Sequence, residues 1–282
     1  MNLTVTIESA ELQFRQILEE FFISAYDEKY LSSHGIDHHR RVWSYSKELL
    51  YLTSNQNQNK TGLFLSPSKL IIASYLHDIG MSVEPGPRHG RHSRELCIQF
   101  LTKNNLNETD YLDVLETIEN HDIKDYTRGT GIVDLLTILS VADDLDAFGL
   151  IGIFRYSEIY LTRGISPLSI GHLIKENAGR RFDNFTKIFK FESGLVQKHR
   201  KRYDILDNFF TEYNKLVDSY QFGLHHPTGH CGVIDVLINL ISNNKELIDM
   251  YQEPDEYFID PVICWFFEGL AKEMLPGQRV LQ

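Results

Sequence analysis

The sequence predicts an all-α protein in which a helical bundle is followed by a helical extension. Apolar residues recur at three- and four-residue spacing through most of the 282 residues, and no segment alternates convincingly between apolar and polar residues. Proline and glycine fall between the periodic segments, where they start and end helices. The chain is 42% hydrophobic and 24% charged, a composition typical of soluble globular proteins.

In the first half of the chain, turn residues separate six predicted helices. The best marked one is SPSKLIIASYLHDIG, which opens with Ser66 and Pro67 and closes at Gly80. SNQNQNKTG at 54–62 and MSVEPGPRHG at 81–90 are predicted to be loops. The six helices are expected at 8–22, from Asp37 to about residue 52, at 66–80, after the Pro- and Gly-rich stretch through Phe100, at 108–121, and from Ile132 to about Phe148.

The second half of the chain is also predicted to be helical, with a loop at QFGLHHPTGHCG (221–232). Helices are expected at 151–164, within 167–220, at 232–243 and at 258–273. We predict three parts: an N-terminal helix in 1–30 that packs on the core, a core in 31–165 that holds the site, and an extension in 166–282 that packs against the core.

Charge and cysteine usage limit the environment and the partners. The net charge of −11 argues against general nucleic-acid binding but allows a small anionic substrate, because a pocket can be locally basic. Three distant cysteines (Cys97, Cys231 and Cys264) predict no disulfide framework, and we see neither a secretion signal nor an apolar run near the roughly 20 residues that span a bilayer. We therefore expect a cytoplasmic protein without membrane contact. Aromatic-rich CWFF makes self-association an option.

Titratable side chains fall on the core-facing stripes of five predicted helices. A buried carboxylate or imidazole is costly without a partner, and a shared divalent metal ion would supply one. Neighbouring residues within a helix do not face each other, but His77 and Asp78 end their helix and can reach one ion there. The set comprises His38, His77 with Asp78, His89, His121 and Asp143.

These residues lie, in order, in HHRRV (the pattern H-x-x-R-V), LHDIG, HGRHS, ENHD and VADDLDAFG. The ordered set resembles the HD-domain metal-dependent phosphohydrolases, an all-α superfamily named for its metal-binding His-Asp doublet. The resemblance covers about residues 30–165 and includes ADDLDAFGLIGIFR, which is similar to a stretch of small bacterial HD hydrolases. It implies an HD-domain helical bundle, and the C-terminal part gives no family signal.

The resemblance implies metal ligands at His38, His77, Asp78 and Asp143. Members with a fuller site add histidines that correspond here to His89 and His121. We expect one ion with these two histidines lining the pocket, and keep two ions bridged by Asp78 as the alternative. Imidazole and carboxylate ligands suit Mn, Fe, Co, Ni or Mg, and Zn as a further option.

The implied activity is hydrolysis of a phosphoester or phosphoanhydride by metal-activated water, on a nucleotide or related small phosphorylated metabolite. Asp78, His89, His121 and Asp146 are the candidate catalytic residues, with Asp146 orienting a ligand histidine. Asp122 is either a base or a helix-end acid, and Arg41 is expected to brace an acidic helix end. Candidate phosphate contacts are Arg88, Arg91, Lys124 and Arg155.

Two departures from the family pattern bear on the substrate. Met81 stands where many relatives carry a lysine after HDIG, so that phosphate contact is missing. MSVEP supplies only Glu84 where the superfamily's guanosine-tetraphosphate hydrolases place an acidic pair, so we rank that activity below a general nucleotide phosphatase or pyrophosphatase.

Other functions stay open at this point. A ligand-sensing or regulatory module could keep the fold without turnover, and a diiron HD oxygenase would use the same ligand types; the full ligand set favours catalysis. His225, His226, His230 and Cys231 have zinc-like spacing, but Pro227 and Gly229 favour a structural or surface loop. KHRKR at 198–202 is expected to be a solvated helix face.

Overall fold

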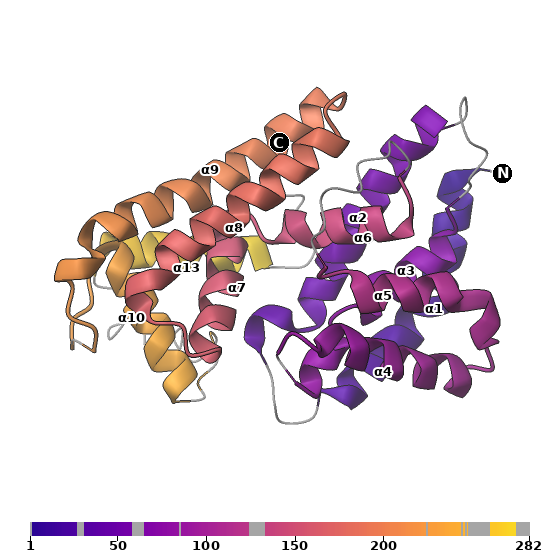
Figure 1. The fold of residues 1–282 in the computed structure, drawn as a ribbon, viewed down its shortest axis with the longest axis horizontal. Helices are drawn as coiled ribbons and strands as arrows, with labels where there is room; N and C mark the ends of the chain where they lie inside the picture. The colour runs from indigo at the N-terminus through magenta and orange to yellow at the C-terminus, as the bar shows by residue number, and fades with distance from the viewer. Residues whose placement is uncertain are drawn as a thin grey trace. The chain divides into compact units, whose positions relative to one another are not determined.

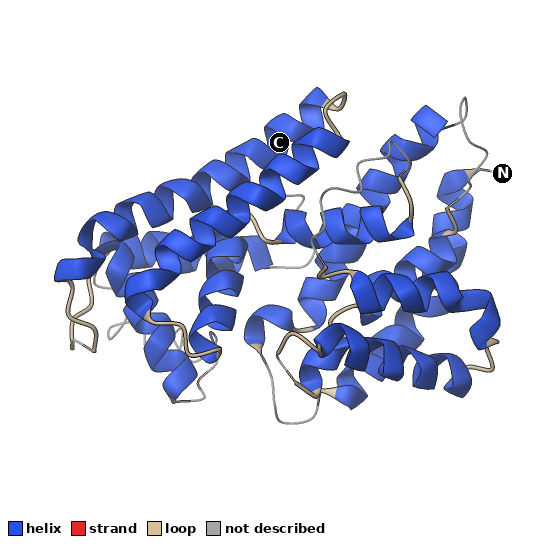
Figure 2. Cartoon of the chain, in the orientation of Figure 1, coloured by secondary structure: helices blue, strands red, loops and turns tan. Residues whose placement is uncertain are grey.

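In a computed structural model of the chain, the described residues are 2–26, 31–57, 65–84, 86–123, 133–223, 225–243, 245, 247 and 260–274. They are helical with connecting turns, and none of them lies in a strand (Figures 1 and 2). The all-α prediction is therefore confirmed. Within the described residues, no helix is long and apolar enough to cross a membrane.

The chain divides into two compact units, which we call the first unit (residues 1–30 and 34–146) and the second unit (residues 31–33 and 147–282). The division predicted from the sequence, at 30/31 and 165/166, stays a prediction. All three cysteines are free thiols.

The first unit is built around α3 (Pro67–Leu76), which contacts every other α-helix of the unit (Figure 1). Its sequence explains this central place, because Ser66 precedes it in an extended conformation, Pro67 starts it, and residues 70–76 are all buried. The surrounding elements are α1 (Leu3–Ala25), α2 (Ile36–Asn57), η2 (Ile79–Ser82), α4 (His89–Lys103), η3 (Glu108–Tyr111), α5 (Leu112–Asn120) and α6 (Leu135–Asp146). Of the short η1 (Ser32–His34), only His34 belongs to the first unit.

Amphipathic periodicity forms the bundle around α3. In α1 the buried positions are Ile7, Ala10, Phe14, Leu18 and Phe22, spaced by three and four residues. Two predicted boundaries differ: α2 continues through Asn57, into the stretch predicted to be a loop, and α4 starts at His89, inside the predicted Pro- and Gly-rich loop.

The second unit is arranged around α7 (Gly149–Thr162), which contacts each of the four other α-helices found among the described residues of this unit. These are α8 (Pro167–Ile188), α9 (Ser193–Leu216), α10 (Gly229–Ser242) and α13 (Pro261–Met274), and the short η4 (Val217–Ser219) follows α9. The loop predicted over 221–232 was wrong at its end, because α10 begins at Gly229.

The prediction of a solvated face at 198–202 was wrong for two of its five residues. His199 and Arg202 of α9 are buried, at 0% and 4% exposure. Arg202 donates a hydrogen bond to the Phe148 carbonyl at 2.7 Å and lies 3.9 Å from the Glu273 carboxylate. Three residues apart on one helix face, the two side chains point inward while their neighbours stay solvated.

Candidate metal centre

The His-Asp doublet sits where α3 ends. His77 has helical dihedral angles, whereas Asp78 has φ −108° and ψ 6°, and η2 begins at the next residue. This change of backbone direction lets two neighbouring side chains point at one place, as the sequence predicted. The Gly80 amide donates to Ser93 Oγ at 2.8 Å, and a Cβ at Gly80 would collide with the backbone of α4, so only glycine fits this contact.

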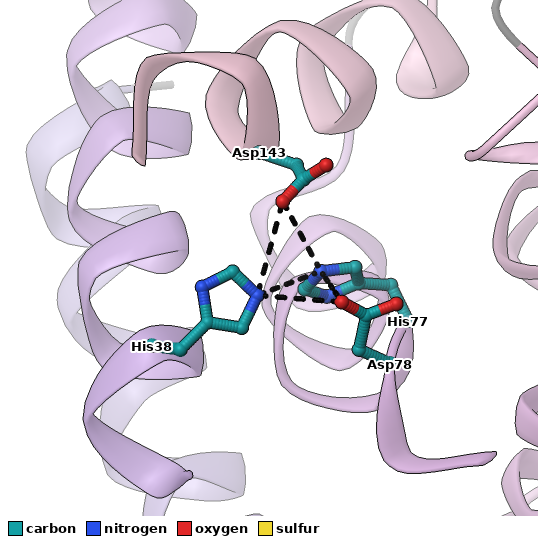
Figure 3. Close-up of side chains that lie close together, drawn as sticks. All are labelled: His38, His77, Asp78 and Asp143. Carbon is teal, nitrogen blue, oxygen red and sulfur yellow. Dashed lines mark hydrogen bonds and ion pairs between the residues drawn. The ribbon is translucent and has the colours of Figure 1, made fainter. Parts of the chain in front are cut away.

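Four side chains from three helical elements form the first cluster, around Asp78 Oδ2 (Figure 3). His38 Nε2 and His77 Nε2 lie 3.5 Å and 3.4 Å from this oxygen, and 3.2 Å from each other. Asp143 Oδ1 completes the cluster, at 3.8 Å from His38 Nε2 and 3.9 Å from His77 Nε2. All four residues are buried, and their donor atoms lie within 4.8 Å of one another.

A second cluster forms around the other oxygen of Asp78. His121 Nε2 lies 2.9 Å from Asp78 Oδ1, and His89 Nε2 lies 3.2 Å from the same atom. The two imidazole nitrogens are 3.4 Å apart. Asp78 therefore has one carboxylate oxygen in each cluster, and each cluster could hold a metal ion.

Backbone and side-chain acceptors fix the far side of every imidazole in the two clusters. His77, His89 and His121 each place Nδ1 within 3.0 Å of a backbone carbonyl, those of Ser74, Gly86 and Ile118. His38 Nδ1 lies 2.8 Å from Asp146 Oδ2. If Nδ1 carries the proton donated to these acceptors, all four Nε2 lone pairs face the Asp78 carboxylate, and such a donor set fits a bound cation.

Without a bound cation, the charge of Asp78 favours protonated histidines around it, and a divalent ion would take the place of those protons. Burial lowers the pKa of His77, but the charge of Asp78 and its hydrogen bond outweigh burial and raise that pKa. For His89, burial is likewise outweighed by the contact with Asp78, which raises the pKa to about 9. Burial raises the pKa of Asp78, yet the surrounding histidines hold it well below its usual range. The buried carboxylate is thus built to stay ionised among groups that can carry or bind positive charge.

Asp146 and Arg41 support His38 from behind. Arg41 Nε donates to Asp146 Oδ1 at 2.7 Å and Nη2 donates to Oδ2 at 3.1 Å. The pKa of Arg41 is raised because the charge of Asp146 outweighs the effect of burial. Asp146 thus lies behind a histidine of the cluster, and Arg41 lies against the acidic end of α6, while the roles predicted for them stay predictions.

The predicted phosphate contacts are not among the gathered residues. Arg88 and Arg91 have exposed side chains paired with Glu84 and Glu95. Lys124 lies outside the described residues. Arg155 is buried in α7 of the second unit, near Glu158. Their phosphate-binding role stays a prediction, as does a role for Asp122, which is exposed after α5. Met81, which replaces the lysine of many relatives, is buried.

Two further histidines are buried beside the clusters and were not predicted from the sequence. His34, the last residue of η1, has its Nε2 4.0 Å from Asp78 Oδ2. His39 packs against the rings of His77 and Phe22, and neither of its nitrogens has a hydrogen-bond partner among the described residues. Burial keeps the pKa of His39 well below its usual value, so it serves as a neutral packing residue. The four-residue spacing between His34 and His38 could have suggested that His34 lies on the same side as His38.

The zinc-like histidine cluster does not assemble a site. His225 and His226 are exposed, while His230 packs against Phe209 in the first turn of α10. Within the described part of the chain, the two groups that could hold an ion both contain Asp78.

Comparisons with known proteins agree with this geometry. Residues 35–147 match the family model described as the HD domain. A search of curated proteins and a search of solved structures each found no match. The match spans every residue of the two clusters, as well as Asp146. Residues 35–147 therefore form an HD domain, which confirms the resemblance to the HD-domain metal-dependent phosphohydrolase superfamily.

Proposed function

We propose that this protein is a metal-dependent phosphohydrolase that acts on a nucleotide or a related small phosphorylated metabolite. The observation that carries the proposal is the convergence of four imidazole Nε2 atoms on the two oxygens of Asp78, with Asp143 beside them. These donors are buried and come from different elements, an arrangement that costs free energy unless a cation occupies it.

The donor set fits hard or borderline divalent ions such as Mn, Fe, Co, Ni, Mg or Zn, because it contains imidazoles and carboxylates without a thiolate. His38, His77, Asp78 and Asp143 would hold the first ion. Such an ion would polarise a phosphoryl oxygen and lower the pKa of a water molecule. That chemistry is hydrolysis of a phosphoester or phosphoanhydride.

The protein's own residues supply alignment and charge. Asp146 fixes the ring of His38, so that Nε2 stays aimed at the cluster. Asp78 has one oxygen in each cluster, which supports the alternative of two ions, with His89 and His121 as donors to the second. In that arrangement the Asp78 carboxylate would supply negative charge to both ions.

The substrate class follows from charge. Two divalent ions would make a centre with two carboxylates and four neutral imidazoles positive, so that it attracts an anionic phosphate. A single ion would leave the centre near neutral, and the phosphate would then bind through an open coordination position of that ion. The base, the sugar and the number of phosphates are to be found by a screen.

The test combines metal analysis of the purified full chain with a Mn²⁺-dependent hydrolysis screen of nucleotides and other phosphoesters. We expect bound divalent metal and release of phosphate or pyrophosphate, both abolished by Asp78→Ala. Asp113→Ala is the matched control, because Asp113 is an exposed carboxylate of α5. Metal-free wild type together with hydrolysis that survives Asp78→Ala would refute the proposal. Bound iron with a visible charge-transfer band and no hydrolysis would indicate an oxygenase instead.

A further inference from the structure

We propose that His34 donates a hydrogen bond from Nε2 to a phosphoryl oxygen of the bound substrate. The phosphate contacts predicted from the sequence are all arginine or lysine side chains and do not include His34. The inference rests on the proposed function, since it assumes that a phosphorylated substrate enters the Asp78 centre.

The position of His34 beside the centre is the first support. It ends η1, one turn before His38, and the two imidazole rings are 5.3 Å apart. Its Nε2 lies 4.0 Å from Asp78 Oδ2, the oxygen shared by His38 and His77. That separation is too long for a direct hydrogen bond, so the Nε2 of His34 lies beside the carboxylate without being held by it at hydrogen-bond distance.

His34 borders the ring of donors rather than belonging to it. The donor atoms of His38, His77, Asp78 and Asp143 lie within 4.8 Å of one another, and His34 is not part of this group. An imidazole next to a metal cluster, but outside its mutual contacts, is suited to contact what the ion binds. Its N–H can donate to a phosphoryl oxygen whether the ring is neutral or protonated.

The described arginines near the helices that carry the two clusters already form ion pairs with carboxylates. Arg41 binds Asp146, Arg88 and Arg91 bind Glu84 and Glu95, and Arg94 lies 3.3 Å from Glu119. Using one of them for phosphate would break a carboxylate pair.

The experiment measures binding of inorganic phosphate to the Mn²⁺-loaded full chain by calorimetry, with Mn²⁺ affinity measured separately. Three variants separate the roles of the ring: His34→Gln keeps an N–H donor near the position of Nε2, His34→Asn keeps one near Nδ1, and His34→Ala keeps neither. His172→Ala is the control, because His172 is an exposed histidine of α8. Circular dichroism checks that each variant is folded.

We expect His34→Ala and His34→Asn to weaken phosphate binding by about 10- to 100-fold, the usual effect of losing a hydrogen bond to a charged group. His34→Gln should stay within about threefold of wild type, and Mn²⁺ affinity should be unchanged in all three. A parallel loss of Mn²⁺ affinity would make His34 a metal ligand and overturn the inference, as would unchanged phosphate binding in folded His34→Ala. If the wild-type protein binds Mn²⁺ and hydrolyses phosphoesters, either of these results rejects the role of His34 and leaves the proposed phosphohydrolase function intact. If the wild-type protein neither binds Mn²⁺ nor hydrolyses phosphoesters, the proposed function and the role of His34 both fail.

Discussion

Asp146 and His38 form a buried pair in which the carboxylate Oδ2 lies 2.8 Å from the imidazole Nδ1, on the side facing away from the metal cluster. Asp146 also accepts two hydrogen bonds from Arg41, so its orientation is fixed in turn. The pair determines which nitrogen of His38 is presented to Asp78 and Asp143.

We therefore expect Asp146→Asn to weaken divalent metal binding by about 10- to 100-fold, the usual cost of losing a supporting carboxylate. The amide can still accept from His38, but it lacks the charge that fixes the tautomer and balances Arg41. Calorimetric titration with Mn²⁺ measures the effect, and Asp113→Asn on the exposed face of α5 should bind like wild type. Wild-type affinity in Asp146→Asn would show that the pair only packs.

The number of ions is tested by His121→Ala. His121 Nε2 lies 2.9 Å from Asp78 Oδ1, on the side away from the four-residue cluster. If the second cluster holds an ion, wild type binds two Mn²⁺ per chain at saturation and His121→Ala binds one, by elemental analysis. His172→Ala should keep both. One ion per wild-type chain would return His89 and His121 to the role of pocket-lining residues.

Gly80 makes the close approach of η2 to α4 possible, so Gly80→Ala should be destabilising. The added Cβ would collide with the His89 carbonyl oxygen and the Ser93 amide nitrogen, both of them backbone atoms that cannot move aside. We expect a loss of about 3 kcal/mol in the free energy of unfolding, together with weaker metal binding. Gly194→Ala is the matched control, because nothing lies within 4 Å of its added Cβ. Equal urea midpoints for the two variants would contradict this reading.

The ionised carboxylate of Glu19 stabilises the folded protein, and this contribution is lost at acidic pH. It accepts hydrogen bonds from Arg40, Arg15 and Tyr75, and Arg40 lowers its pKa from 4.5 to about 2 in spite of partial burial. A depressed carboxyl pKa contributes stability that is fully present above the unfolded value and is lost as the pH falls through the folded value.

Glu19→Gln should therefore lower the free energy of unfolding by about 2 kcal/mol at pH 7, and the difference from wild type should shrink between pH 5 and pH 2. Urea unfolding across this range measures both quantities. Glu20→Gln is the control, because Glu20 pairs only with exposed Gln16 among the described residues. A difference that persists unchanged at pH 2 would mean that the charge of Glu19 is not its cause.

From the sequence we could predict those residues of the centre whose side-chain direction follows from helix periodicity. His38, His121 and Asp143 lie on the buried stripes of their helices or continue them, and the end of α3 explains the doublet. His34 escaped prediction because it precedes α2 in a short 3-10 turn, separated from the helix by Gly35, so no stripe assigned it a direction.

Burial of charged residues was harder to foresee. A basic run predicts solvent exposure from composition, but Arg202 is buried because a specific backbone carbonyl, that of Phe148, accepts from it. Such a partner is 54 residues away in sequence and becomes known only from the fold. Arg88 and Arg91 differ in this respect, because their carboxylate partners Glu84 and Glu95 are only four residues away in sequence and could have been foreseen.

The donors of the four-residue cluster span the chain from residue 38 to residue 143, almost the full extent of the HD domain. An ion bound to all of them would act as a cross-link that closes several long loops at once. Its binding free energy would then appear as resistance to unfolding of the whole first unit, not only as catalytic competence. Chelation should accordingly make this unit more susceptible to proteolysis.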